Sequence, residues 1–365
     1  MEIAINDSAP RVLDPNVLLD VENLTVGFPT DDGVVNAVRG VSYQLRKGEA
    51  LGIVGESGSG KSVSSLALLG LLPKTAQISG SARFRGEELV GLSEMEYTKY
   101  RGNKIAMIFQ DPLTSLNPVY TVGWQIAEAV LAHNDVTKEA ARDRAIELLD
   151  RVGIPHPKQR VDNYPHELSG GMRQRVVIAI AMANNPDIII ADEPTTALDV
   201  TVQAQVLEAL EAARAETGAA LVLITHDLGV IAGHADRICV MYAGKLVEKG
   251  SVEEVFYRPR MPYTLGLLGS LPRVDEASGK HDRLTPIVGV PPSLLNLPPG
   301  CPFTPRCPLA QDICDVEEPD LVQTNTPDHL AACHYHERLV GVTSAELFRP
   351  VSIDVESVAD LEAQS

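Results

Sequence analysis

Short apolar segments alternate with amphipathic segments between about residues 18 and 251. Residues 50–54, 188–190 and 220–224 consist almost entirely of aliphatic side chains and small residues, which is typical of strands buried on both faces of a sheet. Segments between them, such as 200–213, have apolar residues at helical spacing. Buried strands that alternate with helices predict a parallel sheet covered on both faces, and therefore an α/β fold.

The first part of this region follows a different pattern. Residues 18–26 alternate in part and predict a strand, and 34–45 predict a second pair of strands with a turn at Arg39–Gly40. Residues 83–87 predict an edge strand with a turn. Short, partly alternating strands of this kind indicate an antiparallel β subdomain beside the parallel sheet.

Helical patterns interrupt the strands in the middle of the chain. Residues 122–133 and 137–152 both have helical apolar spacing, with Thr137 as a plausible N-cap. Because predicted strands lie before them, at 105–109, and after them, at 188–190, we expect an inserted helical subdomain at about 111–180.

The composition changes at about residue 258, where prolines become dense and four of the five cysteines occur. We therefore expect four parts: a loosely held N-terminus at 1–17, a main domain at 18–257, a loop-rich domain at 258–340 and an acidic, partly disordered tail at 341–365.

The length, composition and net charge of the chain narrow the class of protein. A chain of 365 residues fits two domains, and 44% apolar residues suffice for a globular core. The net charge of −18 argues against a non-specific nucleic-acid binder, which normally has a basic surface. No apolar run approaches the ~18 residues of a membrane span, and the N-terminus has no signal-peptide pattern. We therefore expect a cytosolic chain that reaches a membrane only by docking onto other proteins.

The segment after the apolar run 50–54 matches the phosphate-loop pattern G-x-x-x-x-G-K-[S/T] at every required position. Its eight residues are Gly55, Glu56, Ser57, Gly58, Ser59, Gly60, Lys61 and Ser62. A helix is predicted to follow, and this strand–loop–helix context favours a phosphate loop over a Gly/Ser-rich linker. Backbone N–H groups of such a loop cradle a polyphosphate, Lys61 can reach the β- and γ-phosphates, and the Ser62 hydroxyl can hold Mg²⁺.

Two carboxylates, Asp192 and Glu193, follow the predicted strand that begins at Ile188. The carboxyl ends of parallel strands meet at one edge of a sheet, so we expect both side chains near the phosphate loop. Asp192 can hold Mg²⁺ directly or through water, and Glu193 can orient and deprotonate a water that attacks the γ-phosphate. Without a phosphate loop in the chain, a solvated acidic turn would be the simpler interpretation.

Ser169, Gly170 and Gly171 open an apolar helical segment. The serine hydroxyl and the free N–H groups of such a helix start can bind a second phosphate. One nucleotide cannot easily be gripped by two sites this far apart in one chain, so we expect this site to serve a nucleotide held by another subunit. Alone, the same residues would indicate an ordinary helix cap.

In this order, the three motifs resemble those of the nucleotide-binding subunits of ATP-binding cassette (ABC) transporters. The resemblance covers about residues 18–251 and implies a P-loop NTPase core of the RecA-like type with an antiparallel β subdomain and an inserted helical subdomain. It also implies four more roles: Phe28 stacks on adenine, Gln110 touches Mg²⁺ and the attacking water, Asp199 couples the two sites of a dimer, and His226 contacts the γ-phosphate. Taken singly, Gln110, Asp199 and His226 would more often be ordinary surface or core residues. Their order and their sequence contexts support the functional roles.

The C-terminal region resembles the extension found in ATPases of oligopeptide and dipeptide importers, a group that includes the related nickel and glutathione importers. The resemblance rests on residues 260–268 and 299–307. Residues 109–118 resemble the same group, as does Met172, which follows the signature glycines where glutamine is more common.

The clustered cysteines have the spacing C-x5-C-x6-C-x18-C, formed by Cys301, Cys307, Cys314 and Cys333. In a reducing cytosol this clustering favours metal ligation over disulfides. The spacing alone leaves zinc and iron–sulfur equally open, with unligated thiols as a further alternative; the resemblance implies a [4Fe–4S] cluster. Cys239 lies within an apolar strand and is expected to be a buried structural thiol.

The resemblance implies an ATPase at the cytoplasmic face of the cell membrane, peripheral to it, that uses ATP and Mg²⁺ to drive peptide uptake. Its implied partners are a second ABC ATPase subunit, identical or similar, two transmembrane permease subunits and an extracytoplasmic solute-binding protein, with no nucleic acid. A soluble ABC ATPase acting on ribosomes or DNA is a competing class, but such proteins usually have two cassettes or a long coiled-coil insert. An importer of another solute, such as nickel or glutathione, stays open.

Overall fold

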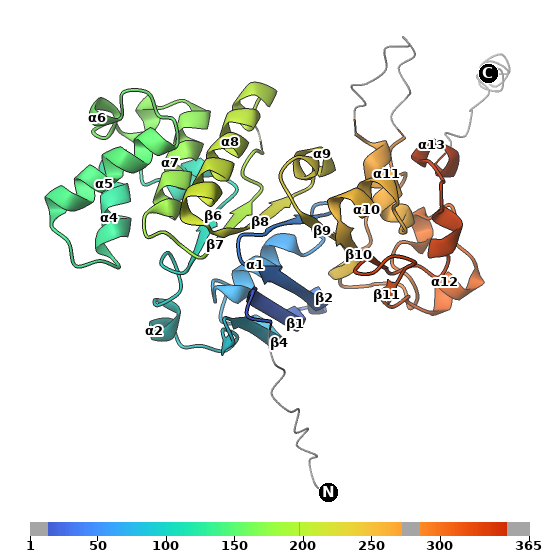
Figure 1. The fold of residues 1–365 in the computed structure, drawn as a ribbon. Coiled ribbons are helices and arrows are strands. Elements are labelled where there is room, and N and C mark those ends of the chain that lie inside the picture. The colour runs from blue at the N-terminus through green and yellow to red at the C-terminus, as the bar shows by residue number, and fades with distance from the viewer. Residues whose placement is uncertain (1–13, 197, 272–284, 349–365) are drawn as a thin grey trace, which may run out of the picture. The chain divides into compact units, whose positions relative to one another are not determined.

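The structure is a computed structural model that describes residues 14–196, 198–271 and 285–348. These residues form two compact units. The first runs to Leu246 and also contains Ser293–Asn296, and the second comprises Val247–Pro292 and the chain from Leu297 onward (Figure 1). Most of the predicted N-terminal segment 1–17 and of the predicted tail 341–365 lies outside the described residues.

A parallel sheet forms the centre of the first unit, with the neighbouring strands in the order β9-β3-β8-β7-β6. The bounds are β3 (Ala50–Val54), β6 (Ile105–Ile108), β7 (Ile188–Asp192), β8 (Ala220–Thr225) and β9 (Arg237–Tyr242). Strands β3, β7 and β8 are buried at every residue, as expected for aliphatic strands covered on both faces. The α/β prediction is confirmed.

Helix α1 (Lys61–Leu68) follows β3, α8 (Val200–Thr217) connects β7 with β8, and α9 (Leu228–Ala232) connects β8 with β9. Helix α8 begins where the Asp199 side chain accepts the N–H of Val202 at 3.0 Å, which satisfies one of the free donors of the first turn.

A second sheet in the same unit is antiparallel, in the order β2-β1-β4-β5. Its strands are β1 (Val17–Thr30), β2 (Gly33–Arg46), β4 (Gln77–Phe84) and β5 (Glu87–Glu88). The predicted turn at Arg39–Gly40 is wrong, because β2 continues through it. Gly40 has a φ of 90°, and a Cβ there would lie 2.7 Å from Oδ1 of Asn23. The glycine therefore marks a bulge in a continuous strand and not a chain reversal.

Five α-helices lie between β6 and β7 in the sequence: α3 (Pro112–Ser115), α4 (Val122–Leu131), α5 (Lys138–Arg151), α6 (Pro157–Arg160) and α7 (Gly170–Met182). Helices α4, α5, α6 and α7 are labelled in the green region of Figure 1, and α4, α5 and α7 pack together. Thr137 caps α5 as predicted, accepting the N–H of Ala140 at 3.2 Å. The short helix α2 (Glu94–Tyr97) precedes β6.

The second unit is built from short elements. Its strands are β10 (Lys245–Ser251), β11 (Val322–Gln323) and β12 (Leu330–Ala331), of which β10 begins just before the unit boundary. Its α-helices are α10 (Val252–Tyr257), α11 (Pro262–Gly269), α12 (Asp312–Val316) and α13 (Ser344–Leu347). Tyr263 and Phe303 are fully buried and meet edge to face, with ring centroids 5.5 Å apart. No helix within the described ranges is long and apolar enough to cross a membrane.

Candidate nucleotide site

A pocket of about 510 Å³ lies at the carboxyl edge of the parallel sheet. Its lining runs along the phosphate loop from Glu56 to Val63 and is completed by Gln110, Glu193 and His226. These groups follow β3, β6, β7 and β8, which are neighbours in the sheet, so their carboxyl ends deliver them to one place. The structure therefore brings together residues that are up to about 170 positions apart in the sequence.

The phosphate loop leaves no room for side chains at two of its glycines. A Cβ at Gly55 would lie 2.2 Å from the carbonyl oxygen of Met241, and one at Gly60 would lie 2.3 Å from that of Ala37. Gly60 also has a φ of 99°, in the left-handed region that favours glycine. The Ser59 hydroxyl is buried and has no hydrogen-bond partner among the described residues. A tight loop with an unused buried donor fits a polyphosphate.

Lys61 folds back onto its own loop. Its Nζ donates to the carbonyl oxygens of Gly55 at 2.7 Å and Glu56 at 3.0 Å. Burial lowers the pKa of Lys61, and the nearby carboxylates of Glu193 and Asp192 oppose that shift. The ammonium is thus held over the loop by neutral acceptors that phosphate oxygens can replace.

Ser62 and Asp192 supply adjacent oxygen atoms at the start of α1 and the end of β7. The Ser62 hydroxyl donates to Oδ1 of Asp192 at 2.9 Å. Burial raises the pKa of Asp192, and the hydrogen bond from Ser62 opposes the rise. Paired oxygens next to a phosphate loop fit Mg²⁺, whose charge would favour the ionised carboxylate.

Glu193 occupies a constrained position. Its φ is 45°, an uncommon value for a residue with a side chain that is often found at functional sites. Its N–H donates to the carbonyl oxygen of Ile224 in β8 at 2.8 Å, which fixes the backbone. Its carboxylate oxygen Oε2 lies 3.2 Å from Nε2 of Gln110 and 3.3 Å from Nδ1 of His226. The side chains of the three residues therefore meet at one oxygen atom.

The same oxygen accepts a hydrogen bond that the sequence analysis missed. The Thr196 hydroxyl donates to Oε2 of Glu193 at 2.8 Å, the shortest of the three contacts. The signal in the sequence is the spacing of three residues, which lets a side chain reach back across one turn. It is weak without coordinates, because Pro194 intervenes and the φ of Glu193 is not evident from its residue type.

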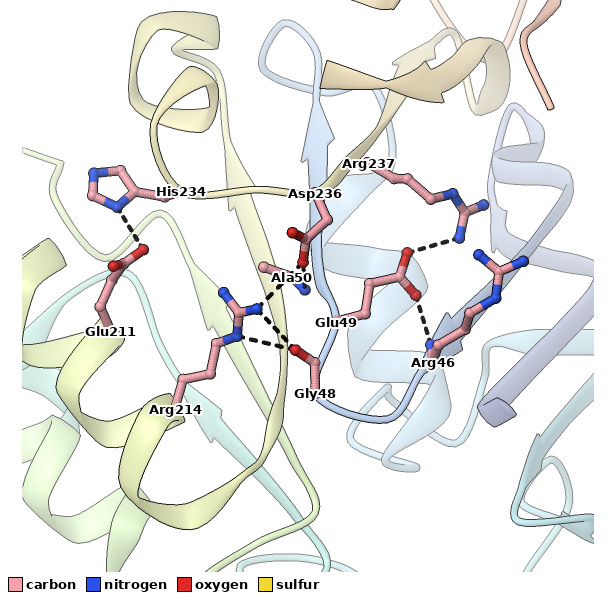
Figure 2. Close-up of polar contacts among 9 residues, drawn as sticks. All are labelled: Arg46, Gly48, Glu49, Ala50, Glu211, Arg214, His234, Asp236 and Arg237. Carbon is pink, nitrogen blue, oxygen red and sulfur yellow. Dashed lines mark hydrogen bonds and ion pairs between the residues drawn. The ribbon is translucent and has the colours of Figure 1, made fainter. Parts of the chain in front are cut away.

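The amino end of β3, opposite the phosphate loop, is anchored by polar side chains (Figure 2). Asp236, just before β9, accepts the N–H of Ala50 at 2.8 Å. Arg214, near the end of α8, donates to the carbonyl oxygen of Gly48 at 2.8 Å and to Asp236 at 3.3 Å. The strand that leads into the phosphate loop is therefore tied to both a neighbouring strand and a helix.

The other predicted nucleotide-site residues do not line this pocket: they are Gly55, Asp192, Phe28, Ser169, Gly170, Gly171 and Asp199. Ser169 caps α7 by accepting the N–H of Met172 at 3.3 Å, which confirms that it opens a helix. A Cβ at Gly171 would lie 2.3 Å from Cγ1 of Val202, so α7 and α8 approach closely there. Phe28 lies in β1 opposite Val35.

None of the five cysteines, all of which lie among the described residues, forms a disulfide. Cys301, Cys307, Cys314 and Cys333 all lie in the second unit as free thiols, and Cys239 is buried in β9 as predicted. Burial raises the pKa of Cys307 to about 12 and that of Cys333 to about 11. Among the described residues, no group of three or more His, Cys, Asp or Glu side chains is arranged to hold a metal ion. The arrangement alone therefore does not support the predicted iron–sulfur cluster.

The fold and the pocket define a P-loop nucleotide-binding protein. Comparison with known proteins agrees: residues 38–196 match the family model described as ABC transporter, and residues 247–314 match that described as oligopeptide/dipeptide transporter, C-terminal region. A dimeric ATP-binding cassette solved in a post-hydrolysis state with ADP and Pi has a TM-score of 0.58 and 30% identity. The match covers 64% of this chain and 98% of that chain.

Relatives with established names are more similar. The oligopeptide transport ATP-binding protein OppD of Salmonella typhimurium is 49% identical over 91% of this chain and 98% of its own length. The dipeptide transport ATP-binding protein DppD of Bacillus subtilis is 54% identical over 82% of this chain and 89% of its own length. The OppD of Mycobacterium tuberculosis is 57% identical over 91% of this chain, which spans only about half (54%) of that longer protein. The chain belongs to the oligopeptide and dipeptide transport ATP-binding proteins of the ABC transporter family.

Proposed function

We propose that the chain is the ATP-hydrolysing subunit of an ABC importer that takes up oligopeptides or dipeptides. The observation that carries this proposal is the convergence of the phosphate loop, Gln110, Glu193 and His226 on one pocket, with Asp192 beside Ser62. The names of the relatives support peptides as the solute, because peptide transport is what those names state.

In the proposed reaction, the loop N–H groups and Lys61 bind the phosphates of ATP, while Ser62 and Asp192 hold Mg²⁺. Bound Mg²⁺ neutralises charge on the phosphate oxygens. Glu193 takes a proton from a water that Gln110 helps to orient, and His226 donates a hydrogen bond to the γ-phosphate. The carboxylate stands within reach of both partners, since its Oε2 already contacts Gln110 and His226.

The site is proposed to be completed by a second ABC ATPase subunit, either a second copy or a similar chain. The phosphate pocket of a single chain is not lined by Ser169, Gly170 or Gly171. This is consistent with their binding a nucleotide that is held by a partner subunit. Asp199 would connect the two sites and Phe28 would stack on adenine. Closure of the pair around MgATP and its reopening after hydrolysis would then drive transport.

A groove of about 620 Å³ is the proposed docking surface for the membrane subunits. It is lined mainly by apolar side chains, including Met107 of β6, Val177 of α7 and Phe109, which directly follows β6. Phe109 is 41% exposed and directly precedes Gln110. A subunit seated there could therefore sense the position of Gln110.

The proposed organisation is a nucleotide-binding domain at 18–257, with a helical subdomain at about 111–180, and a cysteine-rich C-terminal extension at 258–340. The chain would sit at the cytoplasmic face of the membrane, bound to two permease subunits that receive solute from an extracytoplasmic binding protein. No role for nucleic acid is proposed.

Transport tests this function directly. Membrane vesicles containing the chain and its partner subunits, supplied with the binding protein and a labelled oligopeptide, should accumulate label only with hydrolysable ATP. Labelled dipeptide, glutathione and Ni²⁺ should be compared in parallel. Uptake of Ni²⁺ or glutathione without peptide uptake would replace the proposed solute, and association with ribosomes without any uptake would reject the importer.

We also propose that Cys301, Cys307, Cys314 and Cys333 hold a [4Fe–4S] cluster. Three of the sulfurs accept backbone N–H groups from two residues further on, at Phe303 for Cys301, Leu309 for Cys307 and Tyr335 for Cys333. Such bonds stabilise thiolate ligands. In addition, the four thiols are close enough to influence one another's charge. Metal binding would release their protons.

Metal analysis of anaerobically purified protein tests the cluster. We expect a brown sample with about four irons per chain, and loss of colour and iron when Cys307 is replaced by Ser. Cys239→Ser is the matched control, since this thiol lies in β9 and should leave the iron content unchanged. A colourless sample that contains zinc would reverse the assignment.

A further inference from the structure

Three donors from different parts of the first unit meet at one oxygen of Glu193. Gln110 comes from the segment after β6, His226 from the segment after β8, and Thr196 from the turn that follows Glu193 itself. The three donors differ in whether they contact the nucleotide. In the proposed reaction, Gln110 and His226 contact Mg²⁺, water and the γ-phosphate, whereas Thr196 contacts none of these groups.

The turn that holds Thr196 is closed by two hydrogen bonds to Glu193. The N–H of Thr196 donates to the carbonyl oxygen of Glu193 at 3.2 Å, and its hydroxyl donates to the carboxylate at 2.8 Å. The side chain of Glu193 is only 14% exposed, whereas that of His226 is 57% exposed. The hydrogen bond from Thr196 is the shortest of the three contacts to this oxygen, and it is the one made by a residue near Glu193 in the sequence. A hydrogen bond from a hydroxyl to a carboxylate is a strong one.

We infer that Thr196 is a positioning residue that holds one oxygen of the Glu193 carboxylate, so that the other can face the attacking water. This inference deepens the proposed function and rests on it. When MgATP draws Gln110 and His226 away, the hydroxyl of Thr196 stays as the donor that orients the carboxylate. Because a catalytic base must point at its proton to act, loss of this donor reduces turnover without reducing nucleotide binding.

The position of Thr196 also suggests what it connects. Asp199, three residues on, caps α8 and is the residue proposed to face the second subunit. Thr196 thus lies in the short segment between the proposed dimer contact and the base.

The test compares Thr196→Val, which keeps the shape and removes the hydroxyl, with Thr196→Ser, which keeps the hydroxyl. In the assembled transporter we expect kcat for ATP hydrolysis to fall about tenfold in Thr196→Val, with KM for ATP unchanged, and to stay within about threefold of wild type in Thr196→Ser. Thr196→Ala is the second variant without a hydroxyl and should lose a similar factor. Thr98→Val removes a hydroxyl that bonds to the carbonyl oxygen of Met95, outside the pocket, and should leave kcat unchanged.

Several results would overturn the inference. Unchanged or increased kcat in Thr196→Val, a rise in KM at constant kcat, or equal loss in the Val and Ser variants would each contradict a positioning role. Failure of the proposed function looks different: wild-type assembly would not hydrolyse ATP at all, or Glu193→Gln would hydrolyse it at the normal rate. If the wild-type protein hydrolyses ATP and Thr196→Val does so at the same rate, the positioning role of Thr196 is rejected, while the proposed function stands.

Discussion

Replacing Glu193 by Gln should reduce ATP turnover by at least about 100-fold, while the affinity for MgATP stays within about threefold of wild type. General-base catalysis contributes about 10²- to 10⁴-fold to such reactions, and an amide cannot take the proton. Binding should persist because the phosphates are held by the loop, Lys61 and Mg²⁺, whereas the Glu193 carboxylate contacts Gln110, Thr196 and His226. Steady-state phosphate release and equilibrium nucleotide binding measure the two quantities separately.

The control for this substitution is Glu211→Gln. Glu211 lies on α8 and pairs with His234 at 3.0 Å, a contact drawn apart from the others in Figure 2, and it does not line the phosphate pocket. Loss of its charge should leave turnover unchanged. A turnover rate close to wild type in Glu193→Gln would remove Glu193 from its proposed role as the base, and a parallel loss of nucleotide affinity would point to structural damage.

Much of this site could be predicted from the sequence because its motifs follow strands. A buried aliphatic strand such as 188–190 is evident from composition, and the residues that follow it must emerge at the carboxyl edge of the sheet; the observed strand extends to Asp192. The grouping of Asp192, Glu193 and the phosphate loop follows from this rule alone. Their separation in sequence is no obstacle, because parallel pairing fixes which ends of the strands coincide.

Contacts that depend on the exact backbone path could not be predicted. The bond from Thr196 to Glu193 requires a positive φ at Glu193, and no residue type signals that value when the residue is not Gly or Asn. The predicted turn at Arg39–Gly40 was wrong for a similar reason. Glycine serves both turns and bulges, and only the pairing of β2 with β1 shows which one occurs.

The glycines of the phosphate loop also show what a sequence motif predicts and what only the structure explains. The pattern requires Gly55 and Gly60 and leaves Gly58 variable, but it does not say why. In the structure, Gly58 and Gly60 both have positive φ, at 79° and 99°. A Cβ at Gly58 would meet nothing within 4 Å, whereas one at Gly60 would lie 2.3 Å from the carbonyl oxygen of Ala37 in β2. The two positions therefore share a backbone conformation that would strain a residue with a Cβ, and they differ in available space.

Gly60→Ala should consequently weaken MgATP binding by more than about 100-fold, and Gly58→Ala by no more than about 30-fold. A left-handed backbone costs a residue with a Cβ roughly 1–2 kcal/mol, and that cost applies to both variants. Only Gly60→Ala must also displace backbone, because its obstacle is a carbonyl oxygen of a paired strand, and the displacement disturbs the N–H groups that cradle the phosphates. Isothermal titration with MgATP measures the affinities, and thermal unfolding shows whether each variant is folded. Equal losses in two folded variants would mean that strain, and not the contact with Ala37, decides the requirement for glycine at position 60.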